Sequence, residues 1–242
     1  MNTFRRSKAL LVAFVLLGFL LAAQVQSPRQ MTVPKEASRE RVAGTIARLE
    51  EEQRSLKETI GRLREELVAQ QKLGLARSES LREIDSELEK QRLAAGLLPL
   101  KGQGVTVTLD DSSKAVGAGG DPASYLVHDY ELRDVINLLW AFGAEAVAVN
   151  DERHAGGTSI YCVGSTILVN NTRLSPPYEI RAIGEAVALE DKLRNPANLA
   201  RLKSRARLYG IQFRVTSSKE VTLPAYSSGF NLRYSSPAKS GG

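Results

Sequence analysis

Hydrophobic residues form one uninterrupted run near the start of the chain. Arg5, Arg6 and Lys8 precede a run without charged residues that covers residues 9–25. At about 1.5 Å per helical residue the run reaches about 25 Å, the lower limit for a hydrocarbon core of about 30 Å. Because the positive charges lead, the N-terminus is expected on the cytoplasmic side. The pattern predicts a basic cytoplasmic tail over residues 1–8 and a transmembrane anchor over residues 9–25.

A cleaved signal peptide is the alternative interpretation of the same run. Its short length favours cleavage. Its candidate cleavage sites are poor, because bulky Leu21 lies three residues before a cut after Ala23, and Pro28 follows a cut after Ser27. In both interpretations the rest of the chain is expected outside the cytoplasm, beginning with a linker over residues 26–35.

Residues 36–94 show the seven-residue repeat of a coiled coil. Glu, Arg, Lys, Gln, Leu and Ala predominate, and no proline occurs from residue 36 to residue 92, which suits a helix. Alternating steps of four and three from Val42 place apolar residues at the a and d positions, except for a weak stretch at residues 70–77. The predicted coiled-coil seam comprises Val42, Ile46, Leu49, Leu56, Ile60, Leu63, Leu67, Leu81, Ile84 and Leu88.

Two interruptions of the seam leave its architecture open. Gln53 occupies an a position, which costs stability but can fix the register of paired helices. The weak stretch around Gly74 is either a flexible joint or a turn that folds the helix back. A continuous helix over residues 36–92 would be about 85 Å long. The alternative to pairing is a single charged helix that lies on its own domain.

Short alternating and helical patterns follow over residues 96–226. Val105, Val107 and Leu109 alternate with threonines, as in a half-buried strand. Asp129 is expected to cap a helix, and Gly210 is expected to end another. Strands are predicted at 105–109, 146–150, 158–163, 166–170, 178–183, 211–215 and 220–223, and helices at 130–142 and 198–209.

The order of these elements is β-α-β-β-β-β-α-β-β. This order predicts an α+β domain with a mostly antiparallel sheet, built on the split β-α-β plan of ferredoxin-like folds with extra strands. A flexible tail is expected over residues 227–242.

Charge and cysteine content exclude several functional classes. The net charge is +6, and residues 101–242 contribute only +2 of it, so the basic balance is mainly a topology signal at the N-terminus. One short helix with Arg201, Lys203, Arg205 and Arg207 could contact an anionic surface or could simply be solvated. Nucleic acid is not expected as a partner. The single cysteine, Cys162, forms no intrachain disulfide and is expected to be a buried structural thiol.

Polar residues gather at the predicted ends of strands and helices. A metal site is one interpretation of this set; helix caps and turns are the simpler one. The candidates are Asp110, Asp111, His128, Asp129, Asn150, Asp151, Glu152 and His154. We expect no catalytic residue, cofactor or metal, and we expect an interaction surface where His128, Asp129, Asn150 and Arg153 approach one another.

Several segments together resemble a bacterial family known as domain of unknown function 881, with YlxW- and YlxX-like members. They are GVTVTLDDS at 104–112, VHDYEL at 127–132, INLL at 136–139, GAEA at 143–146 and PPYEIRAIG at 176–184. The resemblance covers roughly residues 42–226 and extends to the layout of membrane segment and coiled coil. It implies a role in cell division or sporulation and supplies no catalytic residues.

Two functional hypotheses follow. The first is a membrane-anchored, non-catalytic structural or assembly protein of the cell envelope that acts through a coiled coil and a protein-binding domain, as a homo- or hetero-oligomer. The second is an extracytoplasmic ligand-binding or metal-dependent enzymatic domain that the stalk merely positions. The scarcity of candidate sites favours the first.

Overall fold

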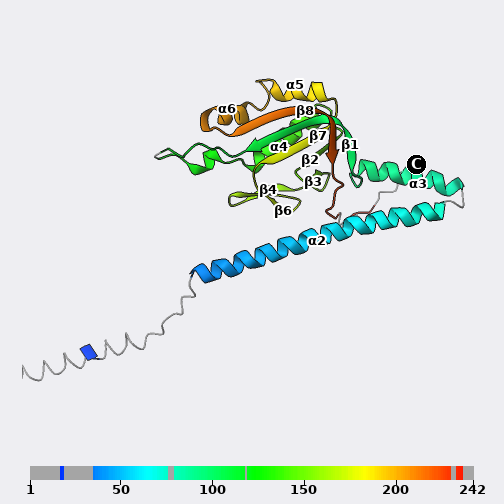
Figure 1. Ribbon diagram of the computed structural model, residues 1–242, viewed down its shortest axis with the longest axis horizontal. Coiled ribbons are helices and arrows are strands. Elements are labelled where there is room, and N and C mark those ends of the chain that lie inside the picture. Colours follow the sequence, from blue (N-terminus) through cyan, green and yellow to red (C-terminus); the bar gives the residue numbers. More distant parts are fainter. Residues whose placement is uncertain (1–16, 19–34, 76–78, 118, 230–232, 237–242) are drawn as a thin grey trace, which may run out of the picture. The chain divides into compact units, whose positions relative to one another are not determined.

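The computed structural model describes residues 17–18, 35–75, 79–117, 119–229 and 233–236 (Figure 1). The predicted anchor over residues 9–25 lies outside this part except for Leu17 and Gly18. None of the described helices is both long and apolar enough to cross a membrane. The chain divides into two compact units, residues 1–49 and residues 50–242, and the interactions described below lie within the second unit.

The described part of the stalk contains two helices. Helix α2 spans Lys35–Leu75 and α3 spans Glu79–Ala94. Arg92 Nη2 donates to Gln71 Oε1 (2.9 Å), which joins the end of α3 to the last turns of α2. Of the two alternatives for the weak stretch, this contact supports a helix that folds back. The length of about 85 Å, which holds for one continuous helix, therefore applies to neither α2 nor α3.

A five-stranded antiparallel sheet forms the centre of the C-terminal domain. Strand β7 pairs with both β1 and β2, and β8 pairs with the other edge of β1. Because α4 joins β1 to β2, β7 separates two strands that one helix connects, which is a split β-α-β connection. The sheet has the order β3 (Glu152–His154), β2 (Ala146–Val149), β7 (Tyr178–Ile183), β1 (Leu100–Asp110) and β8 (Gln212–Leu223).

A second, three-stranded sheet is built from two tight hairpins. It contains β4 (Ile160–Val163), β5 (Thr166–Val169) and β6 (Thr172–Leu174) in that order. Asn170 and Asn171 both have positive φ between β5 and β6, the backbone that a two-residue type I′ turn requires. The sequence prediction missed β6, and it assigned a turn to the residues that form β3, because three-residue strands carry almost no periodic signal.

Three helices cover one face of the large sheet with the main core. Helix α4 spans Asp129–Ala141, and its four predicted apolar residues are all buried: Leu132, Val135, Ile136 and Leu139. Helices α5 (Ala186–Arg194) and α6 (Ala200–Tyr209) supply Leu189, Leu193 and Leu202 to the same core. The opposite face carries a smaller cluster of Ala146, Ala148, Ile183, Val221 and Leu223.

Three predicted boundaries differ from the structure. The N-cap of α4 is His128 and not Asp129. The two predicted final strands form one strand, β8. Helix α5 was missed, although its Glu185 side chain accepts from Ala188 N (3.0 Å) at the first turn and Lys192 and Arg194 occupy the last turn, which are ordinary helix start and stop signals.

Gly104 of β1 has no room for a side chain against the backbone of β7, and this generates a prediction. A Cβ atom on Gly104 would lie 1.9 Å from the carbonyl oxygen of Ala182, whereas a Cβ on Gly156 would meet nothing within 4 Å. Gly104→Ala should lower the free energy of unfolding by about 3 kcal/mol or more, because a backbone atom cannot rotate away. Gly156→Ala is the control in urea unfolding followed by tryptophan emission. Equal midpoints for the two variants would contradict this packing.

Candidate functional site

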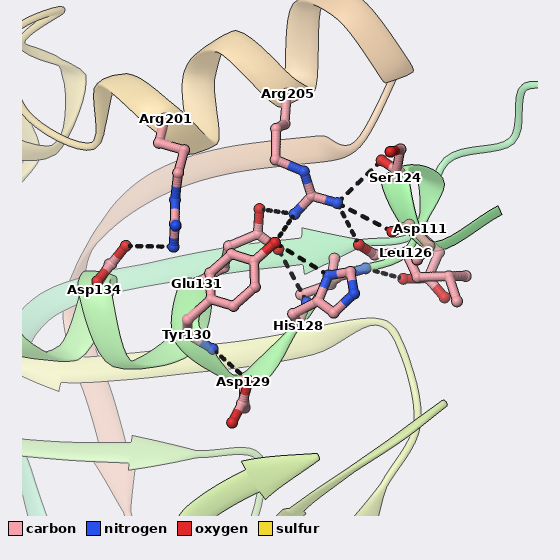
Figure 2. A network of polar contacts seen from close by, with 12 residues as sticks. Asp111, Ser124, Leu126, His128, Asp129, Tyr130, Glu131, Asp134, Arg201 and Arg205 are labelled. Carbon is pink, nitrogen blue, oxygen red and sulfur yellow. Dashed lines mark hydrogen bonds and ion pairs between the residues drawn. The ribbon is translucent and has the colours of Figure 1, made fainter. Parts of the chain in front are cut away.

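Two residues of the predicted interaction surface lie at the start of α4 (Figure 2). The His128 ring stacks on Tyr130, with ring centroids 5.1 Å apart and planes 9° from parallel. The backbone N–H of His128 donates to Glu131 Oε2 (2.9 Å), so Glu131 reaches back over the first turn as in a capping box. Contacts with Tyr130 and Glu131 in the first turn of α4 therefore hold His128 in place.

Arg205 of α6 is the centre of the polar network at this helix start (Figure 2). Its guanidinium forms an ion pair with Glu131, whose side chain is completely buried. It also donates to Tyr130 Oη (2.9 Å). Arg205 Nη2 donates to the carbonyl oxygens of Ala123 (3.3 Å), Ser124 (3.0 Å) and Leu126 (2.9 Å), which lie in and beside the 3₁₀ turn η1 (Pro122–Tyr125). One largely buried cation thus attaches α4, α6 and the loop before α4 to one another.

The basic helix α6 uses three of its four cations within the domain. Arg205 belongs to the network above. Arg201 lies 4.0 Å from the centre of the Tyr130 ring and 3.5 Å from Asp134, and Lys203 Nζ donates to Leu193 O (2.7 Å) and Asn195 O (2.5 Å) at the end of α5. Most of the positive charges of α6, which could have contacted an anionic surface, therefore make contacts within the domain.

Asp129 binds Arg133 and lies against the single cysteine. Asp129 Oδ2 accepts from Arg133 Nη1 (2.6 Å), and Arg133 also donates to Ile160 O (2.7 Å). Partial burial opposes ionisation of Asp129, but the hydrogen bond and charge of Arg133 outweigh it and lower the pKa of the carboxyl. The backbone N–H of Asp129 donates to Cys162 Sγ (3.4 Å), and burial raises the pKa of that thiol. Cys162 is half-buried, not fully buried as predicted.

Asn150 and Arg153, the other two predicted surface residues, make their contacts elsewhere. Asn150 Oδ1 accepts from Glu179 N (2.9 Å) at the turn between β2 and β3. Arg153 is only 4% exposed and donates to Leu98 O (3.3 Å) and Pro224 O (3.2 Å). The four residues do not form one cluster, because β3 returns the chain after Asn150 and turns Arg153 toward the segments that flank β1 and β8.

A shallow groove with a volume of about 770 Å³ lies between α3, β1, α4 and β3. Its most distinctive pair is Trp140 and His154, where the indole N–H donates to His154 Nδ1 (3.3 Å). Because an indole can only donate, His154 accepts through an unprotonated Nδ1. Burial lowers the pKa of His154, in agreement with the neutral form. Among the described residues, no three His, Cys, Asp or Glu side chains gather in a way that could hold a metal ion.

A polar row on α2 contacts the rest of the second unit at intervals of seven residues. We define this polar row as Glu50, Lys57, Arg64 and Gln71. Glu50 pairs with Arg173 (2.8 Å), Arg64 donates to Tyr226 O (2.5 Å), and Gln71 accepts from Arg92. All four residues occupy the position that follows d in the predicted heptad, so these four contacts share one face of the helix.

Lys57 makes the most buried contact of the polar row. Its ammonium lies 2.5 Å from Glu152 Oε1 and 2.5 Å from Thr172 Oγ1. The Glu152 side chain is 6% exposed, and its other oxygen accepts from Asn170 Nδ2 (3.1 Å). The sequence pattern predicts a turn at Glu152 and does not single out Lys57, because nothing local in a charged helix distinguishes a residue that contacts a strand 95 positions later.

The predicted coiled-coil seam lies beside the polar row and is largely open to solvent in the single chain. Ile46 and Leu88 are half-buried, and the side chain of Leu81 lies outside the described part. The exposed members are Val42 (56%), Leu49 (52%), Leu56 (58%), Ile60 (37%), Leu63 (52%), Leu67 (52%) and Ile84 (64%). The polar row therefore supports the alternative of a helix that rests on its own domain. The apolar seam of the same helix stays largely exposed.

The Arg205 network generates a stability prediction. Arg205→Met leaves the buried Glu131 carboxylate without its cation and removes the donors to the loop carbonyls. The free energy of unfolding should fall by about 3–5 kcal/mol. Arg207→Met, on the exposed side of the same helix, should change it by less than about 0.5 kcal/mol. Chemical unfolding of the two variants in parallel checks the difference, and equal effects would show that Arg205 is not structural.

The Trp140–His154 pair generates a pH prediction. The folded state holds the pKa of His154 below its usual 6.5, so the unfolded chain binds more protons in that window. Stability should therefore decrease as the pH falls below about 6.5 and through the folded pKa. Trp140 is the only tryptophan, so its emission should change with the same midpoint as the hydrogen bond breaks. His154→Gln should abolish the step; a midpoint above 6.5 would contradict the burial of the neutral ring.

Comparison with known proteins places the chain in a family. The UPF0749 protein Rv1823 of Mycobacterium tuberculosis is 27% identical over 88% of this chain and 72% of its own length, and the UPF0749 protein YlxW of Bacillus subtilis is 36% identical over 41% of this chain and 42% of its own. A crystal structure of an uncharacterized conserved protein from M. tuberculosis, 27% identical, superposes with a TM-score of 0.49 over 63% of this chain and 99% of that one. The pattern of the bacterial proteins of unknown function DUF881 matches residues 87–236. The chain therefore belongs to the DUF881 family.

Proposed function

We propose that this chain is a membrane-anchored, non-catalytic assembly protein of the bacterial cell envelope. In this proposal residues 9–25 anchor the chain, the ferredoxin-like domain lies outside the cytoplasm, and the protein serves cell division or sporulation. It acts by pairing the α2 seam with a helix of a partner protein and by contacts of its C-terminal domain.

The exposed seam is the observation that carries the proposal. Leucine and isoleucine side chains repeat at a and d over more than three heptads of α2 and stay largely exposed. A contiguous apolar stripe of this kind marks an interaction surface in a soluble region. The polar row holds the same helix to its own domain, so the stripe is presented on a fixed helix face.

The state of the reactive side chains supports a non-catalytic role. Glu131 is buried and paired with Arg205, Asp129 is paired with Arg133, and Cys162 has a raised pKa. A general base needs a free oxygen or nitrogen near a substrate position, and a nucleophilic thiol needs a lowered pKa. These groups are instead used to hold α4, α6 and β4 in place.

The groove at Trp140 favours the second candidate function, a ligand-binding domain on a stalk. Its volume of about 770 Å³ falls in the range of small-molecule sites, and Trp140 and Leu93 expose apolar surface there. His128, Asp129 and Asn150, which we expected to line such a pocket, are not among its lining residues. A ligand that binds in the groove would change Trp140 emission, and Leu93→Arg, which places a charge in the groove, should abolish that change.

The seam generates a prediction about assembly. Leu56→Asp combined with Leu63→Asp places two charges at d positions and should abolish the products that a photo-crosslinker at residue 49 forms in cells. The matched control is Ser55→Asp with Ala69→Asp, which adds two charges at exposed positions off the seam. The proposal is wrong if the products survive the seam variant or disappear equally in the control.

The proposed topology generates a second prediction. Alkaline phosphatase fused after Gly242 should be active in cells, because the leading positive charges keep the N-terminus in the cytoplasm. The same fusion to a chain that lacks residues 1–25 is the control and should be inactive. An inactive full-length fusion, with an active cytoplasmic reporter at the same site, would refute an extracytoplasmic domain.

A further inference from the structure

The polar row and the seam divide the surface of α2 between two kinds of contact. Glu50, Lys57 and Arg64 are bound to residues of the C-terminal domain or the segment after it. Leu56 and Leu63, one position before Lys57 and Arg64, are more than half exposed. The domain therefore covers one flank of the helix and leaves the d positions open to a second helix.

The residue types along the seam select the form of pairing. Ile46 and Ile60 occupy a positions, and leucines occupy the three central d positions (49, 56 and 63). β-branched residues at a with leucine at d favour two parallel strands over higher oligomers. Gln53 is the one polar residue at a within this stretch. In a parallel pair in register it meets its own copy, where two amides can donate to and accept from each other.

The charges beside the seam fit the same arrangement. In a parallel pair each g residue faces the e residue five positions later on the other helix. Glu52 thereby lies beside Lys57 of a second copy, whose ammonium is already bound to Glu152 of its own chain, so this position brings no two like charges together and adds no separate ion pair. The remaining contacts between residue 42 and residue 71 bring no like charges together: Thr45 faces Glu50, Thr59 faces Arg64, and Glu66 faces Gln71.

We propose that the seam of α2 takes a second copy of this chain, in parallel and in register. Two copies then form one two-stranded stalk over about 39 Å between Val42 and Leu67, and the polar row of each copy holds its own domain at the e positions beside the seam. This inference rests on the proposed function and names the partner as the chain itself. Parallel pairing also suits two chains that start from the same membrane.

Disulfide trapping in the full-length chain tests the pairing directly. Cys162→Ser removes the only native thiol. In that background Leu49→Cys and Leu63→Cys are introduced separately, and membranes are oxidised. Each variant should give a disulfide-linked dimer of identical chains, because equal positions face each other along a parallel seam. In an antiparallel pair a residue meets its own copy only at the centre, so two positions 14 residues apart would not both cross-link.

Glu65→Cys in the same background is the control. Residue 65 is exposed on the helix face opposite the seam, so it should give little dimer under the same oxidation. The inference is overturned if Leu63→Cys stays monomeric, or if Glu65→Cys cross-links as readily. Suppose that Leu63→Cys stays monomeric while Leu56→Asp/Leu63→Asp abolishes the photo-crosslinks. The seam then binds a different protein, and the proposed function stands without the second copy.

Discussion

The ion pair between Lys57 and Glu152 governs how the stalk helix meets the domain. Two charges that leave water are costly unless they pair closely and their remaining atoms find hydrogen bonds. Glu152 meets both conditions, because Lys57 holds one oxygen and the Asn170 amide holds the other. The pair fixes which side of α2 faces the domain. The contacts of the other polar-row residues, Glu50, Arg64 and Gln71, lie on the same side of α2 at heptad spacing. The leucine seam lies on the adjacent side.

Two kinds of side chain therefore divide the surface of α2. Polar side chains, each with a defined partner atom, contact the domain, whereas the apolar side chains at a and d stay largely exposed and serve association in the function that we propose. The Arg205 network acts in a similar way inside the domain, where one largely buried cation joins α6, the start of α4 and the η1 loop.

Local patterns in the sequence predicted the elements that have strong periodicity. Leu132, Val135, Ile136 and Leu139 located α4, and Val105, Val107 and Leu109 located β1, because burial on one face imposes a fixed spacing. Strands β3 and β6 are too short for such a signal, and α5 was missed although its capping residue and basic last turn were present. The partners of Arg205 and Lys57 could not be predicted, since Glu131 and Glu152 lie 74 and 95 positions away and the fold alone brings them together.

A double-mutant cycle between α2 and β3 tests the docking of the stalk most directly. The free energy of unfolding would be measured for the wild type, Lys57→Met, Glu152→Gln and the double variant, with tryptophan emission as the probe of the domain. If the polar row docks the stalk, the two single effects should fail to add by about 1–3 kcal/mol, because each substitution strands the other partner. Effects that add to within about 0.5 kcal/mol would mean that Lys57 and Glu152 do not meet, and that α2 does not hold its own domain.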